Sequence, residues 1–188
     1  MSDETPDSEP PSEGEGAGEP DAGGTVIAER YEVQRKLARG GMAEVFVGQD
    51  TSLDRPVAIK VMFPEFAADT AFVERFRREA QAAANLTHPN IVAVYDWGPI
   101  DTTYFMVMEY VSGRTMAEII RAAAPIHPDR AAEGASGVAS ARGFAHRNGV
   151  VLRDIMTAII IFEDAGEVKV ADFGIARDVS GGAGDLTL

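Results

Sequence analysis

The order of the periodic segments constrains the fold of this chain more than any other feature of its sequence. Within the first half, helical spacing occurs once, where Phe72, Phe76 and Ala80 share one face of a helix predicted over 70–85. In the rest of that half, apolar and often β-branched runs predict strands over 31–37, 45–47, 56–62, 91–97 and 104–110. Turns are expected at 38–41 and 98–101. The second half predicts helices over 115–123 and 129–148, then a strand pair at 159–162 and 167–170. Strands followed by helices favour an α+β fold with an antiparallel sheet.

Residues 1–24 differ in composition from everything that follows. They hold eight acidic residues, no basic residue and almost nothing apolar. Such a segment buries too little surface to offset its ordering entropy, so we predict a disordered acidic tail over 1–25. We favour a solvating leader over an interaction tail. Outside residues 1–24, the chain has 22 acidic against 17 basic residues, which speaks against nucleic acid as a partner.

Several classes of protein are excluded by what the sequence lacks. It has no cysteine, which excludes a disulfide scaffold and a cysteine nucleophile. No apolar run approaches the roughly 20 residues that a membrane helix needs. The acidic start of the chain is unlike a signal peptide. We therefore expect a cytoplasmic protein with no membrane segment in this chain.

Three features of the first half point to phosphate chemistry when they are taken together. Gly40 and Gly41 lie at a turn between strands, where backbone amides can approach a phosphate closely, although most such turns are only hairpins. Lys60 ends an apolar strand, and a lysine there either reaches solvent or is held by an acid. Glu79 lies on the helix that follows, beside its apolar face, and is either that acid or a solvated charge. A helix packed on the sheet would aim Glu79 at Lys60.

A fourth feature lies near the end of the chain, where Asp172, Phe173 and Gly174 follow a predicted strand. A carboxylate at a strand end, before an aromatic residue and a glycine, suits a Mg²⁺ ligand on a mobile loop. Taken alone, this tripeptide does not indicate a metal site. In this order and spacing, the four features support one another.

From Tyr31 onward the chain resembles the eukaryotic-like Ser/Thr protein kinases of bacteria. The match lies in the glycine turn, Lys60, Glu79, the link from Leu86 to Val92, the stretch from Met108 to Val111, the pair Arg153-Asp154, and Asp172. The resemblance implies a protein-kinase-like fold, with a complete β-rich N-lobe carrying one regulatory helix and the first part of a helical C-lobe. It places the N-lobe and hinge at 26–111 and the partial C-lobe at 112–188.

The same resemblance implies roles for single residues. Asp154 would be the catalytic base, Asp172 would hold Mg²⁺, and the Glu109 carbonyl and Val111 amide would meet the adenine of ATP. The implied ATP-binding set is Gly40, Gly41, Val45, Ala58, Lys60, Glu79, Glu109 and Val111.

The catalytic loop departs from the family's His-Arg-Asp-Leu-Lys-Pro-x-Asn, because this chain reads Leu152-Arg153-Asp154-Ile155-Met156-Thr157-Ala158-Ile159. Met156 removes a cation that would neutralise the transferring phosphoryl group, and Ile159 removes the side-chain ligand of a second metal ion. Losing one such preorganised contact costs about 10²–10³ in rate. We expect little phosphotransfer, weakened Mg²⁺ binding and no second metal site. Ala38 in place of the first loop glycine is a smaller change.

Two further departures concern the fold. On the helix over 129–148, Gly134, Val138 and Arg142 share the face where the family has apolar anchors, so we expect a damaged core there. Glycines within that helix also lower its propensity by about 1 kcal/mol each. The chain ends inside the expected activation loop, beyond Ser180 and Thr187, which we interpret as a frayed terminus of a truncated lobe.

Three functional interpretations remain open. The chain is an active Ser/Thr kinase, a pseudokinase that binds ATP or docks other proteins, or a non-functional kinase fragment. We commit to a Ser/Thr-kinase-type domain whose family activity is transfer of the ATP γ-phosphate to protein Ser or Thr, with its own catalysis impaired. The expected partners are ATP and other proteins.

Overall fold

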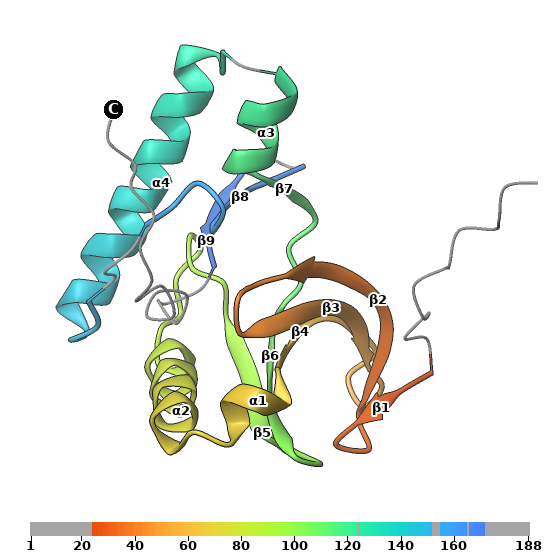
Figure 1. Ribbon diagram of the computed structural model, residues 1–188. Helices are drawn as coiled ribbons and strands as arrows, with labels where there is room; N and C mark the ends of the chain where they lie inside the picture. Colours follow the sequence, from red (N-terminus) through yellow and green to blue (C-terminus); the bar gives the residue numbers. More distant parts are fainter. Residues whose placement is uncertain (1–23, 124, 152–154, 165, 172–188) are drawn as a thin grey trace, which may run out of the picture.

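The computed structural model describes residues 24–123, 125–151, 155–164 and 166–171. Two sheets and four helices occupy these ranges (Figure 1). The strands are β1 (Val26–Ile27), β2 (Tyr31–Arg39), β3 (Ala43–Asp50), β4 (Arg55–Met62), β5 (Val94–Ile100), β6 (Thr103–Glu109), β7 (Gly113–Thr115), β8 (Ile160–Glu163) and β9 (Val168–Val170). The helices are α1 (Pro64–Ala67), α2 (Thr70–Ala84), α3 (Met116–Ala123) and α4 (Pro128–Arg147).

The large sheet has six strands in the order β1-β2-β3-β4-β6-β5, and every pair is antiparallel, as the sequence predicts. Because side chains alternate along a strand, β4 supplies both faces of this sheet. Val57 and Ile59 join an apolar cluster with Tyr31 and Phe105 inside the curve of the sheet. Ala58 and Lys60 lie on the opposite face of the strand, together with Met62, which packs against Phe76 and Ala80 of α2.

Helix α2 forms where the spacing of its apolar residues predicts it. Asp69 caps its first turn by accepting a hydrogen bond from Ala71 N, and Asn85 is its C-cap. Phe76 and Ala80 are fully buried against Met62 and Met106 of the sheet. This packing fixes which residues of α2 point at the sheet, and Glu79 lies among them.

The small sheet has the order β7-β8-β9, and α4 packs on β8 and β9. Of the face expected at positions 134, 138 and 142, Gly134 is buried and Val138 packs against the neighbouring apolar clusters. Arg142 is exposed, and the helix buries Ala141 and Ala145 instead. A Cβ built at Gly134 would lie 2.6 Å from the Phe162 ring, so glycine is what lets α4 approach β8 this closely. The expectation of a damaged core at Gly134 and Arg142 is therefore wrong.

Several boundaries also differ from those expected. Strand β5 begins at Val94 rather than at residue 91, because Ile91 instead bridges to Val170 of the small sheet. It then continues to Ile100, through the turn expected at 98–101. β2 likewise extends to Arg39, and α1, β1 and β7 were not expected. Within the described ranges, no helix combines the length and the apolar character needed to cross a membrane.

Candidate nucleotide site

A buried ion pair joins the large sheet to α2. Lys60 Nζ on β4 lies 3.9 Å from Glu79 Oε1, and the two residues are 6% and 8% exposed. Strand β4 presents Lys60 on the face covered by α2, and the packing of Phe76 and Ala80 turns Glu79 toward it. The contact predicted from the sequence is confirmed, and the alternative of a solvated glutamate is wrong.

Two other predicted residues share this face with Lys60. Val45 lies directly opposite Lys60 in the β3–β4 register, and Ala58 lies two residues before it on the same strand. Met106 and Met108 stand opposite Lys60 and Ala58 on β6. The lysine is thus flanked by apolar side chains, of which Met106 and Met108 were not predicted to belong to the site.

The glycine turn connects β2 to β3, with Gly40 N donating to Ala43 O at 2.8 Å. A Cβ at Gly41 would meet nothing within 4 Å, and one at Gly40 would meet only Ala43 O at 3.4 Å. Neither residue has a positive φ. The chain's own conformation therefore does not demand glycine at either position.

Glu109 ends β6, and Val111, which is half-buried, follows in the link to β7. The Glu109 backbone N–H donates to Ala93 O, and its Oε2 accepts from Ala93 N. Its Oε1 lies 2.8 Å from Lys169 Nζ on β9. Sequence reasoning missed Lys169, although its presence among only three lysines was a usable signal.

The described segment that follows Asp154 is built from backbone bonds and apolar contacts. Ile159 N donates to Met156 O, and Ile159 O accepts from Ala171 N. The Ile159 side chain packs against the cluster that contains Ala141 and Val170. The other predicted residues of this region lie outside the described residues: Leu152, Arg153, Asp154, Asp172, Phe173, Gly174, Ser180 and Thr187.

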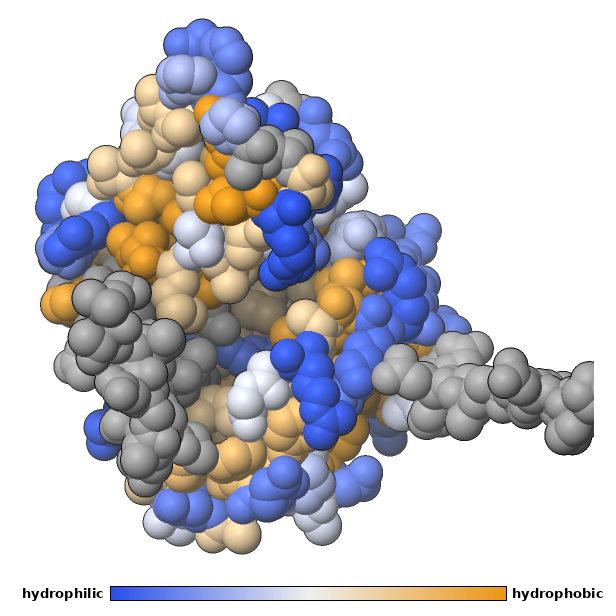
Figure 2. All heavy atoms as spheres, turned by 45° about the horizontal axis from the view of Figure 1, so that its top comes forward, coloured by the Kyte–Doolittle hydropathy of each residue, from blue (hydrophilic) through white to orange (hydrophobic). Residues whose placement is uncertain are grey.

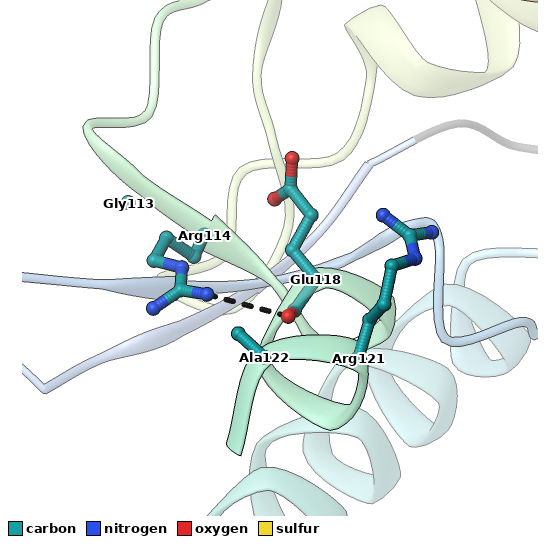
Figure 3. A pocket seen from close by; sticks show the side chains of 5 residues that line it. All are labelled: Gly113, Arg114, Glu118, Arg121 and Ala122. Atoms are coloured by element: carbon teal, nitrogen blue, oxygen red, sulfur yellow. Dashed lines mark hydrogen bonds between the residues drawn. The ribbon is translucent and has the colours of Figure 1, made fainter. Parts of the chain in front are cut away.

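Between the helical part and the large sheet the surface is recessed, as Figure 2 shows with the α3–α4 end turned forward. A different hollow lies on β7 and α3 (Figure 3), and none of its lining residues belongs to the predicted site. Its carboxylate, Glu118, accepts from Thr115 N and Oγ1, while Glu118 N donates to Thr115 Oγ1. This is a capping box that starts α3, and these hydrogen bonds lower the pKa of Glu118. We therefore assign the polar residues of this hollow a role in starting α3 and not in binding a ligand.

No set of three or more His, Asp or Glu side chains within the described ranges is arranged to hold a metal ion. The predicted Mg²⁺ ligand, Asp172, is outside those ranges.

The sequence pattern of the protein kinase domain matches residues 31–186. Among curated proteins, the chain is 46% identical over 157 residues to the serine/threonine-protein kinase PrkC of Bacillus subtilis, covering 84% of this chain and 24% of that protein. It is 43% identical over 165 residues to the serine/threonine-protein kinase PknB of Mycobacterium tuberculosis, covering 86% and 26%. The chain thus spans about a quarter of the length of these relatives.

Comparison with solved structures also identifies a protein kinase fold. The kinase domain of Mycobacterium tuberculosis PknI superposes with a TM-score of 0.72 at 34% identity, over 83% of this chain and 64% of that one. The apo form of PpkA-294, at 24% identity, shares the fold with a TM-score of 0.76. The predicted fold is confirmed: a β-rich N-lobe with a helix against its sheet, and part of a helical C-lobe.

Proposed function

The chain belongs to the protein kinase family, and on that premise we propose that it binds Mg²⁺–ATP beside Lys60 and that its transfer of the γ-phosphate to protein Ser or Thr is impaired. The observation that carries the proposal is the Lys60–Glu79 pair. Two charges buried together cost desolvation that their attraction seldom repays in stability alone. Keeping them on an otherwise apolar face favours a role in binding an anion.

The residues present fit a nucleotide. Gly40 and Gly41 leave open the space that a side chain would fill, although the fold does not require glycine there. Lys60 would bind phosphate oxygens, with Glu79 fixing its ammonium group. Val45 and Ala58 would lie against the adenine, as the family resemblance implies.

The remaining contacts to the nucleotide follow from the family resemblance. The Glu109 carbonyl and the Val111 amide would meet the adenine edge, and Asp172 would hold the Mg²⁺ ion. The bound nucleotide supplies a phosphoryl group whose developing charge must be neutralised for transfer.

The impairment rests on Met156 and Ile159. Methionine offers no charge at the position where the family has lysine, and isoleucine cannot ligate a metal ion. Ile159 is held among apolar side chains, which suits packing and opposes hydration of a nearby ion. Each lost contact costs about 10²–10³ in rate, so the two together leave transfer very slow. Asp154, the predicted base, would then act without a γ-phosphoryl group held in a fixed position opposite it.

Docking to other proteins is a role that the chain could fill with little phosphotransfer. We therefore extend the proposal to a pseudokinase of the cytoplasm that presents its surface to other proteins. The mild charge of residues 25–188 favours proteins over nucleic acid as partners.

Binding is tested by titrating the whole chain with Mg²⁺–ATP, with Lys60→Met as the variant. Lys36→Met is the matched control, because Lys36 also pairs with a glutamate, Glu44, at 2.7 Å but on the surface. We expect Lys60→Met to weaken ATP binding at least tenfold and Lys36→Met to leave it unchanged, about 1.4 kcal/mol being one factor of ten. Equal affinities for the two variants would overturn the site.

Helix α2 offers a second matched pair for the same titration. Glu79→Gln removes the buried partner of Lys60, whereas Glu74→Gln removes an exposed glutamate whose partner is Arg77. Only Glu79→Gln is expected to weaken binding. Transfer is tested separately, by comparing labelled phosphate incorporated by the natural chain and by Asp154→Asn. The proposal predicts equal background in both, and incorporation clearly above Asp154→Asn would contradict it.

A further inference from the structure

The two sheets are tied together by an ion pair that the kinase motifs do not include. Lys169, in the middle of β9, is 12% exposed at its side chain and places Nζ 2.8 Å from Glu109 Oε1. Glu109 is the last residue of β6, and its side chain is 25% exposed. A second carboxylate, Glu163 on β8, lies 3.9 Å from the same ammonium. The pair therefore spans from the end of the large sheet to the small sheet.

Both carboxylate oxygens of Glu109 are held by donors on different parts of the chain. Oε1 faces Lys169, and Oε2 accepts from Ala93 N at 3.2 Å. The Glu109 backbone N–H also donates to Ala93 O at 2.8 Å. The side chain and the backbone of Glu109 are therefore fixed to the same neighbour.

The segment that holds Glu109 is itself bonded to β9. Val92 N donates to Val170 O, Val170 N donates to Asn90 O, and Asn90 Nδ2 donates to Val168 O at 2.7 Å. Lys169 thus closes a ring of contacts that runs from β9 to residues 90–93, on to Glu109, and back to β9. Among the contacts of this ring, the Lys169–Glu109 pair is the one ion pair, and removing the lysine would break it.

An exposed pair of this kind would contribute little, because solvent screens it and both side chains lose entropy. This pair differs, since both side chains are mostly buried and the distance is that of a charge-assisted hydrogen bond. Loss of the lysine would leave the Glu109 carboxylate partly desolvated and without the cation that balances its charge. The Glu109 side chain would then keep only its bond from Ala93 N, and the end of β6, where the link to β7 begins, would lose one of its anchors.

We propose that Lys169 is a positioning residue for the nucleotide: by clamping Glu109, it sets the direction in which the link after β6 presents its backbone groups to the adenine. The inference rests on the proposed function, and it deepens that function by adding a residue that does not touch ATP. Lys169 acts through Glu109, whereas Lys60 acts on the phosphates directly.

The test separates the adenine end of the ligand from the phosphate end. Adenosine and Mg²⁺–ATP are each titrated into the whole chain, into Lys169→Met and into Lys60→Met. We expect Lys169→Met to weaken both ligands by the same factor, about tenfold, as expected for loss of one well-placed hydrogen bond. Lys60→Met should weaken Mg²⁺–ATP and leave adenosine unchanged.

Further variants distinguish clamping from a general loss of stability. Lys169→Arg should restore adenosine binding, because it returns a cation to Glu109. Glu109→Gln should weaken adenosine binding, and adding Lys169→Met to it should cause little further loss, since both act on one contact. Lys36→Met is the control for removal of a lysine that is 35% exposed. If Lys169→Met does not fold, Lys169→Arg and Glu109→Gln carry the test.

The possible failures are distinguishable. If the natural chain binds Mg²⁺–ATP and adenosine, and the folded Lys169 and Glu109 variants bind adenosine equally well, the clamp is overturned and the proposed function stands. If the natural chain binds neither ligand, the proposed function falls and the clamp falls with it.

Discussion

Ile159 shows how one residue can exchange chemistry for packing. Its side chain contacts the cluster of Ala141 and Val170 from a position where the family has a metal-ligating asparagine. Ile159→Asn should therefore reduce the free energy of unfolding by about 2–4 kcal/mol, because it loses apolar contacts and places an amide among apolar groups. Ile159→Val should cost only about 0.5–1.5 kcal/mol. Urea unfolding of both variants measures the difference, and equal losses would contradict a packing role.

His88 makes stability depend on pH near neutrality. Its Nδ1 accepts from Asn90 N, which puts the ring proton on Nε2, beside Ser140 Oγ at 3.2 Å. Burial, with a smaller effect from Arg147, lowers the pKa of His88 below its usual 6.5. The unfolded chain then binds the extra proton more readily, so stability is full above pH 6.5 and falls as the pH drops toward the lowered pKa.

The measurement is the free energy of unfolding between pH 7.5 and pH 5.5. We expect it to decrease with falling pH in the natural chain and to decrease less in His88→Gln. His146→Gln is the control, since His146 is exposed on the same helix that His88 packs against. An unchanged slope in His88→Gln would show that the His88 ring does not titrate as described.

Among single residues, the sequence identified those whose chemistry is tied to a local motif. Lys60 and Glu79 were found because each stands at a recognisable place on a strand or a helix. Lys169 was not found, because its partner Glu109 is distant in sequence and the two meet only once residues 90–92 are bonded to β9. A pattern along the chain carries no information about that bridge.

At the scale of elements, α4 provides a matched pair of glycines. A Cβ at Gly134 would lie 2.6 Å from the buried Phe162 ring, whereas one at Gly143 would meet only Arg147 Nη1 at 3.4 Å. Gly134→Ala should destabilise the protein by about 1–3 kcal/mol through overpacking. Gly143→Ala should stabilise it by up to about 1 kcal/mol, as expected for helix propensity. Thermal melts of the two variants should shift in opposite directions, and a stabilising Gly134→Ala would refute the close approach.

The same helix explains where prediction from sequence reaches its limit. The extent of α4 was nearly right, because caps and composition mark its ends. The face was right at Gly134 and Val138 and wrong at Arg142, because a strict spacing of four passes over Ala141, which is the residue that is buried. Only the position of the small sheet selects between them. The strand expected from residue 91 began late for a similar reason, since Ile91 bonds to a strand outside the large sheet.

At the scale of the molecule, the two sheets hold together by more than the link between them. Leu86 and Ile91, which precede that link, lie in one apolar cluster with Ala141, Ala145 and Val170, which follow it. We therefore expect a chain cut between Ser112 and Gly113, through an inserted protease site, to remain a single body. Size-exclusion chromatography after cleavage measures this, with the uncut chain as the control. Separation of the two pieces under native conditions would contradict the shared cluster.

The position of Leu86 and Ile91 also decides how halves of different relatives could be exchanged. A recombinant joined at the link after β6 would pair one parent's Leu86 and Ile91 with another parent's α4, and the cluster would contain side chains that never evolved against each other. A joint at residue 85 would keep the whole cluster from one parent. Exchanges made there should therefore yield folded hybrids more often than exchanges made at the apparent boundary between the lobes.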